Sequence, residues 1–115
     1  MAAFKKRFTD KLDEFNYYRL NTAFMMFAAA AAKARSNDPI KVAQALEGMK
    51  WTSSVGEVEM RADNHQLLQP LYVATFTDTV KFDAEKTGLG FKTDLRIEAK
   101  DTAMPTTCQM QRPSS

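Results

Sequence analysis

A change in hydrophobic period near Trp51 constrains the fold of this chain more than any other feature. Before Trp51, apolar residues recur at three- and four-residue steps, which is typical of helices, and after it they alternate, which is typical of strands. The stretch from Ser36 to Phe76 contains this change, and its pattern predicts a helix, a glycine stop and two short strands joined by a polar loop. The chain is therefore expected to place its helices first and its strands second.

The helix that precedes the change has clear start and stop signals. Asp38 stands at an N-cap position and Pro39 follows at the first helical position, where a proline loses no hydrogen bond. Gly48 lies near the end, where glycine most easily adopts the left-handed conformation that stops a helix. The expected buried stripe of this helix consists of Val42, Ala45, Leu46 and Met49.

Two further helices are predicted nearer the N-terminus. Phe4, Phe8 and Leu12 share one face of a helix expected over residues 3–13. A longer helix is expected over residues 17–35, and its surface, rich in alanine and phenylalanine, predicts burial on more than one side. Together with the capped helix, they make three N-terminal helices.

Alternating apolar residues predict strands in the second half of the chain. A strand is expected around Val58, and a second over Leu71 to Phe76, which is rich in residues that favour strands. Val80 to Phe82 and Phe91 to Ala99 are predicted as further strands. The composition from Asp101 onward predicts an extended and poorly packed tail.

Composition excludes several classes of function. At 115 residues, with 44% apolar and 26% charged residues, the chain has the size and composition of one globular domain. Its net charge of +2 is too small to indicate a nucleic-acid surface. Cys108 is the only cysteine and His65 the only histidine, so no internal disulfide, thiolate metal cluster or histidine triad is expected. We expect no metal and no cofactor.

The chain carries no predicted membrane or secretion segment. Its longest apolar run, Ala23 to Ala32, is far shorter than the roughly 20 residues that a membrane span needs. The N-terminus lacks the apolar core and the small-residue cleavage site of a secretory signal. These features indicate either a cytosolic protein or a piece of a larger one whose signal lies elsewhere.

Two groups of polar residues are candidates for a functional site. Asp63 and His65 lie close together in a predicted turn, where a surface turn is favoured over a general acid–base pair. The cluster Tyr17-Tyr18-Arg19-Leu20-Asn21-Thr22 lies at the start of the long helix, where its tyrosine, asparagine and threonine groups can hydrogen-bond a small polar ligand. Packing of the helix entry on the core is favoured over that interpretation, and Tyr17, Tyr18 and Asn21 are the candidate contacts if a ligand binds. No nucleophile–base pair is evident, so we expect the protein not to be an enzyme.

An ordered series of motifs resembles the C-terminal third of the branched-chain amino-acid-binding proteins of ABC importers, which have the type I periplasmic binding-protein fold. The motifs are AAAKARSNDP, KVAQALEGMKW and VGEVEMRADNHQLLQPLYVATF, preceded by FKKRF and followed by PTTCQMQRP. The chain departs from the family pattern where Asn21 and Thr22 stand for Tyr-Asp before Ala23, and where Arg35 replaces a usual glycine. A full member of the family is about three times as long, with two α/β lobes.

The resemblance implies a fold class and a domain organisation. It implies an α+β fragment of an α/β type I periplasmic binding protein, in which three N-terminal helices precede a small antiparallel sheet of two to four strands. Residues 1–55 are similar to the end of the first lobe and residues 56–100 to the end of the second, with an extended tail at 101–115. Val55 and Gly56 then correspond to the last hinge, or crossover, between the lobes.

The resemblance also implies a function for the parent protein. That parent captures a branched-chain or related amino acid outside the cytoplasm, in the periplasm, and delivers it to a membrane permease. Tyr17, Tyr18 and Asn21 are the candidate ligand contacts in this chain, which is expected not to bind ligand alone. The alternative is a free-standing α+β interaction module without a small-molecule ligand. Either way, an apolar helix face without its sheet predicts a homo-oligomer or a domain-swapped dimer.

Overall fold

The computed structural model describes residues 2–9, 17–81, 83 and 86–113, and it confirms the expected α+β class. The helices are α1 (Ala2–Arg7), α2 (Tyr17–Ala34), α3 (Pro39–Leu46) and the short 3₁₀ helix η2 (Ala99–Thr102). The strands are β1 (Lys50–Ser53), β2 (Gly56–Met60), β3 (Leu67–Leu68), β4 (Leu71–Thr77) and β5 (Gly90–Ile97). They form one antiparallel three-stranded sheet, ordered β1-β2-β3, and a separate two-stranded ribbon, β4-β5.

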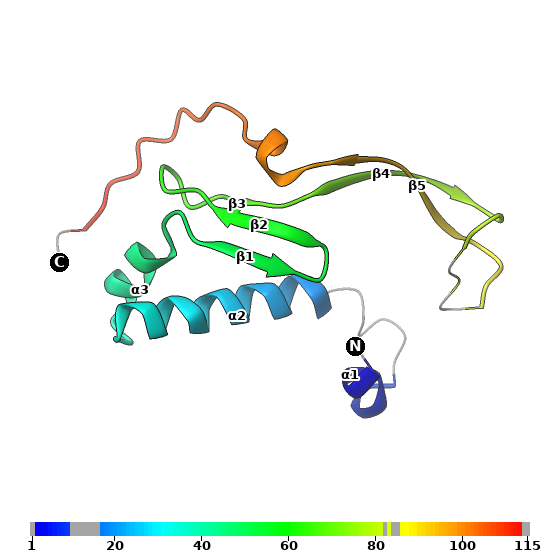
Figure 1. Cartoon of the computed structure of the whole chain (residues 1–115), viewed down its shortest axis with the longest axis horizontal. Coiled ribbons are helices and arrows are strands. Elements are labelled where there is room, and N and C mark those ends of the chain that lie inside the picture. The colour runs from blue at the N-terminus through cyan, green and yellow to red at the C-terminus, as the bar shows by residue number, and fades with distance from the viewer. Residues whose placement is uncertain (1, 10–16, 82, 84–85, 114–115) are drawn as a thin grey trace.

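The core lies where α2 packs against the three-stranded sheet and α3 (Figure 1). Its buried apolar side chains come from all three elements and are Met26, Ala30, Val42, Val58 and Leu68. This core is small for the length of the chain. The radius of gyration is 17.5 Å, whereas a compact chain of this length has a radius of about 13 Å.

The long helix is buried on one side only, so the expectation of burial on more than one side is wrong. Thr22, Met26 and Ala30 recur every four residues and face the core. Phe24 and Phe27 leave 70% and 58% of their surface exposed. In the described part of the chain, no sheet or helix lies over that second face (Figure 1). Leu20, Phe24 and Phe27 are therefore exposed to solvent.

Helix α1 is shorter than predicted in the described residues. It ends at Arg7, and residues 10–13, which complete the expected helix, lie outside the described residues. The Phe4 ring packs against Phe8 at 4.8 Å and against Tyr17 at 4.7 Å between ring centroids. The apolar stripe predicted for this helix therefore joins α1 to the start of α2.

Two strands of the sheet were not predicted from the sequence. β1 pairs with β2, with Trp51 opposite Val58, and the two residues of β3 pair with the other edge of β2. Met49, expected in the helical stripe, instead extends this ladder, because its carbonyl accepts a hydrogen bond from the Met60 N–H at 2.9 Å. Strands this short carry little local pattern, and pairing with β2 creates them.

The ribbon β4-β5 extends away from the rest of the molecule (Figure 1). Its register pairs Leu71 with Ile97 at the base and Phe76 with Phe91 near the tip, with a bulge between Val73 and Ala74. Val80 and Lys81 are not in a strand, contrary to the prediction for 80–82, and Phe82 lies outside the described residues. Val80 instead packs its side chain against Gly90 at the start of β5.

The tail is extended as predicted, but it is anchored to the body of the protein. Arg61 donates a hydrogen bond from Nη1 to the Met104 carbonyl at 2.6 Å. Near the C-terminus, Arg112 donates from Nε to the Glu47 carboxylate at 2.7 Å. The expectation of a poorly packed tail is therefore wrong at these two points, because two guanidinium groups fix its course.

Helix α3 has the cap that the sequence predicts. The Asp38 carboxylate accepts hydrogen bonds from the N–H groups of Ile40 at 3.0 Å and Lys41 at 3.1 Å. The helix ends at Leu46, and Gly48 follows with a φ of 68°. Local side-chain chemistry thus determines both ends of α3.

Loss of the Asp38 cap is expected to destabilise the protein. Asp38→Ala leaves two N–H groups without their acceptor and should lower the free energy of unfolding by about 1 kcal/mol. Urea unfolding followed by circular dichroism measures the change. Asp38→Ser keeps a capping oxygen and serves as the control. Equal losses in the two variants would show that the cap does not stabilise α3.

Candidate functional site

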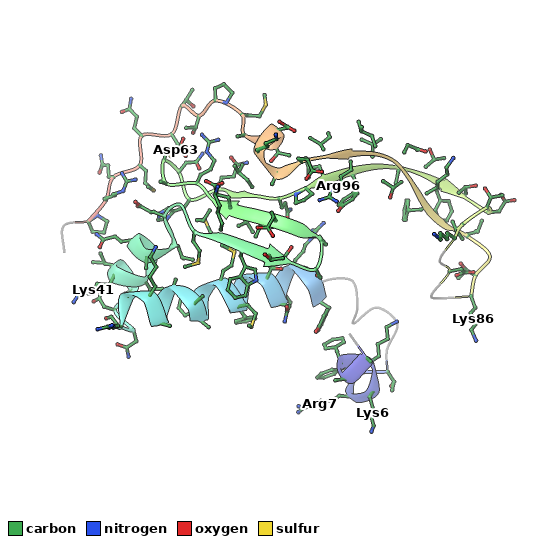
Figure 2. The ribbon with its side chains drawn as sticks, in the orientation of Figure 1. Lys6, Arg7, Lys41, Asp63, Lys86 and Arg96 are labelled. Carbon is green, nitrogen blue, oxygen red and sulfur yellow. The ribbon has the colours of Figure 1, made fainter. Side chains whose placement is uncertain are left out.

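The ribbon meets the rest of the molecule at a small cluster that we call the junction: Val55, Gly56, Pro70, Tyr72 and Arg96. The Tyr72 hydroxyl donates a hydrogen bond to the Val55 carbonyl at 2.9 Å, and the Arg96 guanidinium lies over the Tyr72 ring at 5.9 Å. Figure 2 shows Arg96 at the base of the ribbon, on the side of the three-stranded sheet. The junction therefore joins the turn between β1 and β2 to both strands of the ribbon.

Gly56 allows this close approach because it has no side chain. A Cβ atom at this position would lie 2.9 Å from Nη2 of Arg96 and 3.1 Å from Cγ of Pro70. Its φ of 124° also lies outside the left-handed helical region that other residues occasionally adopt. Gly56 is thus required by both packing and backbone conformation.

A pocket of about 540 Å³ opens beside the junction, and its size is within the range of small-molecule sites. It lies between the start of α2, the strands β2 and β3, and the base of β4. Its polar lining residues include Arg19, Thr22 and Gln69. The remaining lining residues are mostly apolar: Val55, Val58, Leu67, Pro70, Leu71 and Tyr72.

This lining suits a small molecule that is both anionic and apolar. A guanidinium can pair with a carboxylate, and a buried threonine and a glutamine can orient polar groups through hydrogen bonds. The apolar wall formed by Val58 and its neighbours can hold an aliphatic group. These are binding groups, and none of them supplies an activated nucleophile.

The predicted ligand residues Tyr17, Tyr18 and Asn21 have different surroundings in the structure. The half-buried Tyr17 ring packs on Phe4, so this residue has a structural contact between α1 and α2. Asn21 is exposed and does not line the pocket, and Tyr18 lies in α2 with a side chain outside the described residues. Arg19 and Thr22 belong to the predicted cluster but were not among its predicted ligand contacts; they lie three residues apart and line the pocket from one face of α2.

Of the predicted hinge residues, Val55 lies in the turn between two paired strands and Gly56 is the first residue of the second strand, β2. Their flanking strands share one ladder, with Ser53 opposite Gly56, so the residues on either side of the turn belong to one sheet. The chain leaves this sheet between Leu68 and Leu71, at Gln69 and Pro70. The predicted hinge residues thus contact the connection to the ribbon in space without forming it.

Asp63 and His65 have separate partners in the structure. Asp63 forms an ion pair with Arg61, and a hydrogen bond from that guanidinium lowers the pKa of the Asp63 carboxyl. Nε2 of His65 lies 3.1 Å from the Glu47 carboxylate. A hydrogen bond from Arg112 lowers the pKa of Glu47. The geometry agrees with a structural turn, which is the interpretation favoured from the sequence.

Neither a metal centre nor a membrane span is evident in the described residues. Among them, no three His, Cys, Asp or Glu side chains gather in a way that could hold a metal ion. None of the described helices combines the length and the apolar character needed to cross a membrane. The pocket beside the junction is the candidate site because its lining combines a guanidinium residue with an apolar wall.

Comparison with solved structures first defines the fold. The model is similar to the closed conformation of the leucine-, isoleucine-, valine-, threonine-, and alanine-binding protein from Brucella ovis, with a TM-score of 0.68 and 23% sequence identity. The similarity covers 78% of this chain and 25% of the Brucella chain, so this chain spans about a quarter of the length of that protein. No curated protein matches the chain.

Comparison with family models then gives the family. Residues 1–81 match the model described as periplasmic binding protein, which accounts for most of the chain. The chain therefore belongs to the periplasmic binding protein family. The resemblance found in its motifs is confirmed by a match that includes α2, α3, the three-stranded sheet and β4.

Substitution of Gly56 is expected to disturb the junction. In Gly56→Ala the new methyl group displaces the Arg96 side chain and presses on Pro70, and the backbone is strained as well. We expect a loss of unfolding free energy on the order of 2 kcal/mol, measured by urea unfolding.

Gly48→Ala is the matched control for this prediction. Gly48 also has a positive φ, of 68°, but no atom lies within 4 Å of a Cβ built there. Its substitution should cost about 1 kcal/mol from backbone strain alone. Equal losses at the two glycines would contradict a packing role for Gly56.

Proposed function

We propose that this chain is part of an extracytoplasmic solute-binding protein that captures branched-chain or related small amino acids for an ABC importer. The observation that supports this most strongly is the pocket beside the junction, in a chain of the periplasmic binding protein family. Arg19 matches an α-carboxylate in charge, and the apolar wall matches an aliphatic side chain. The name of the Brucella protein includes amino acids of this kind.

The mechanism proposed for the whole protein is closure of two lobes around the ligand. Residues 1–55 would belong to one lobe and residues 56–100 to the other, with the tail at 101–115, so the ladder between β1 and β2 would cross the boundary between the lobes. The junction then lies where the two parts meet, so a ligand held beside it contacts both and stabilises the closed state. Tyr17, Tyr18 and Asn21 remain proposed contacts of the ligand in that state. The protein would act in the periplasm with a membrane permease and carry out no chemical reaction.

A ligand held by this chain alone would lack most of its contacts. The chain spans 25% of the Brucella protein, and small-molecule sites usually bury most of the surface of their ligand. We therefore propose that the isolated chain does not bind ligand appreciably.

Calorimetric titration tests this proposal. Leucine and valine added to the isolated chain should give no binding tighter than about 1 mM. A micromolar affinity that Arg19→Ala abolishes would contradict the prediction and would locate a complete site in this chain. Lys41→Ala, which removes one positive charge from an exposed position outside the pocket, is the matched control for Arg19→Ala.

The alternative function is a free-standing interaction module that oligomerises and binds no small molecule. The exposed apolar residues favour it, since Leu20, Phe24 and Phe27 on α2 and Phe76 and Phe91 on the ribbon are all exposed. An open reading frame that continues upstream of Met1 and begins with a signal peptide would favour the solute-binding protein. A start codon with its own ribosome-binding site would favour the module.

Self-association of the 115-residue chain is expected under both proposals. Light scattering behind a sizing column should give a mass above the 13.0 kDa of the monomer at micromolar concentration. Phe24→Glu should lower that mass because it places a charge on the apolar face of α2. Lys41→Glu, at an exposed position of α3, should leave the mass unchanged. A monomer in the unmodified chain would contradict the prediction.

A further inference from the structure

The C-terminal segment, residues 104–113, runs on the opposite side of the molecule from the ribbon tip (Figure 1), and its last residues, 110–113, line a groove there. We define the α3 groove as Ile40, Ala43 and Gln44 of α3, the C-cap residue Glu47, and His65 of the turn between β2 and β3. These residues and the end of the segment enclose a pocket of about 230 Å³. The groove thus lies apart from the pocket beside the junction.

Arg112 makes the main contact of the segment with this groove. Its Nε donates to Oε1 of Glu47 at 2.7 Å, and its Nη2 donates to the Ala62 carbonyl. A single planar guanidinium therefore donates to two acceptors, one at the C-cap of α3 and one in the turn between β2 and β3. A lysine, with a single charged nitrogen, cannot reproduce that geometry.

The receiving carboxylate also contacts a residue outside the segment. Glu47 is the C-cap residue of α3, and its Oε1 atom lies 3.1 Å from Nε2 of His65. Its side chain is only 22% exposed. Hydrogen bonding from Arg112 lowers the pKa of Glu47, so the carboxylate is ionised at neutral pH. The acceptor is thus positioned by elements that do not belong to the segment.

The other end of the segment is held by a similar device. Arg61, fixed by its ion pair with Asp63, donates to the Met104 carbonyl at 2.6 Å. Figure 2 places Asp63 on the turn that lies next to the segment. Between the two attachment points, residues 105–111 form no helix or strand and most of their side chains are exposed. Attachment therefore depends on a few specific contacts rather than on a continuous interface.

We propose that the α3 groove is a binding site for an extended peptide that carries an arginine followed by a proline, and that the protein's own C-terminal segment is its resident and releasable occupant. Pro113 supports this choice, because a residue before proline is restricted to extended conformations and Arg112 is therefore preorganised for the groove. Covalent linkage gives the segment a high effective concentration, so few contacts suffice to hold it. The proposal is independent of the proposed amino-acid binding.

The first test measures the order of the segment in the full chain. Backbone ¹⁵N relaxation should show residues 106–112 ordered in the unmodified protein and flexible in Glu47→Gln and Arg112→Ala. Arg112→Lys should also release the end of the segment, because it loses one of the two acceptors. Glu59→Gln is the matched control, since Glu59 pairs with Lys50 on the neighbouring strand and does not touch the segment.

The second test supplies the occupant from outside. A synthetic peptide with the sequence of residues 104–113, with serine in place of Cys108, is added to the full-length Arg112→Ala chain. The backbone signals of Ile40, Ala43 and Gln44 should shift, and a peptide with alanine at the arginine position should bind at least about tenfold more weakly. The unmodified chain should bind the peptide more weakly than Arg112→Ala, because its own segment competes.

Clear outcomes would overturn the proposal. A segment that is flexible in the unmodified chain, or equally ordered in Glu47→Gln, shows that the Glu47–Arg112 contact does not hold it. A peptide that shifts no signals on α3, or binds equally well without its arginine, shows that the groove is not a peptide site. Unchanged backbone signals of the core residues Met26 and Val58 in Arg112→Ala without peptide would exclude loss of folding as the cause.

Discussion

The packing of α2 on the three-stranded sheet is the interaction on which the rest of the structure depends. Thr22, Met26 and Ala30 provide the contact face, and small side chains at two of these positions let the backbone of α2 lie close to its neighbours. α3 completes this core through Val42. Everything beyond it is attached at few points: the ribbon through the junction, and the tail through two arginines. This explains why so small a core carries such an extended molecule.

The sequence predicts those parts of the fold that local chemistry determines. Asp38, Pro39 and Gly48 define α3 because a cap, a fixed φ and a positive φ each act within a few residues. β1 and β3 could not be predicted in the same way, since two to four residues carry no reliable period and exist as strands only through pairing with β2. The burial of α2 was overestimated because an apolar surface shows what a helix could cover, whereas contact depends on neighbours elsewhere in the chain.

The candidate site shows the same division. The sequence points to the start of α2, and the pocket does open there, but through Arg19 and Thr22 rather than Asn21. Which side of the helix faces a pocket depends on the position of β2 and of Pro70, and these are distant in sequence. Val55 and Gly56 were selected as a hinge by resemblance. The structure gives them a physical task at the junction, where the absence of a side chain at residue 56 lets Arg96 and Pro70 approach.

The bulge between Val73 and Ala74 has a consequence for whatever covers the ribbon. Directly paired residues share a face, so Val73 and Leu95 point to one side, whereas Phe76 and Phe91, the third pair beyond the bulge, point to the other. Because β5 has one extra residue at the bulge, its odd-numbered residues on one side of the bulge face the opposite way from its odd-numbered residues on the other side. The apolar face at the base of the ribbon is therefore the opposite face from the apolar face at its tip. A single flat surface can exclude water from only one of these two apolar faces. A complete cover must therefore contact the ribbon from both sides.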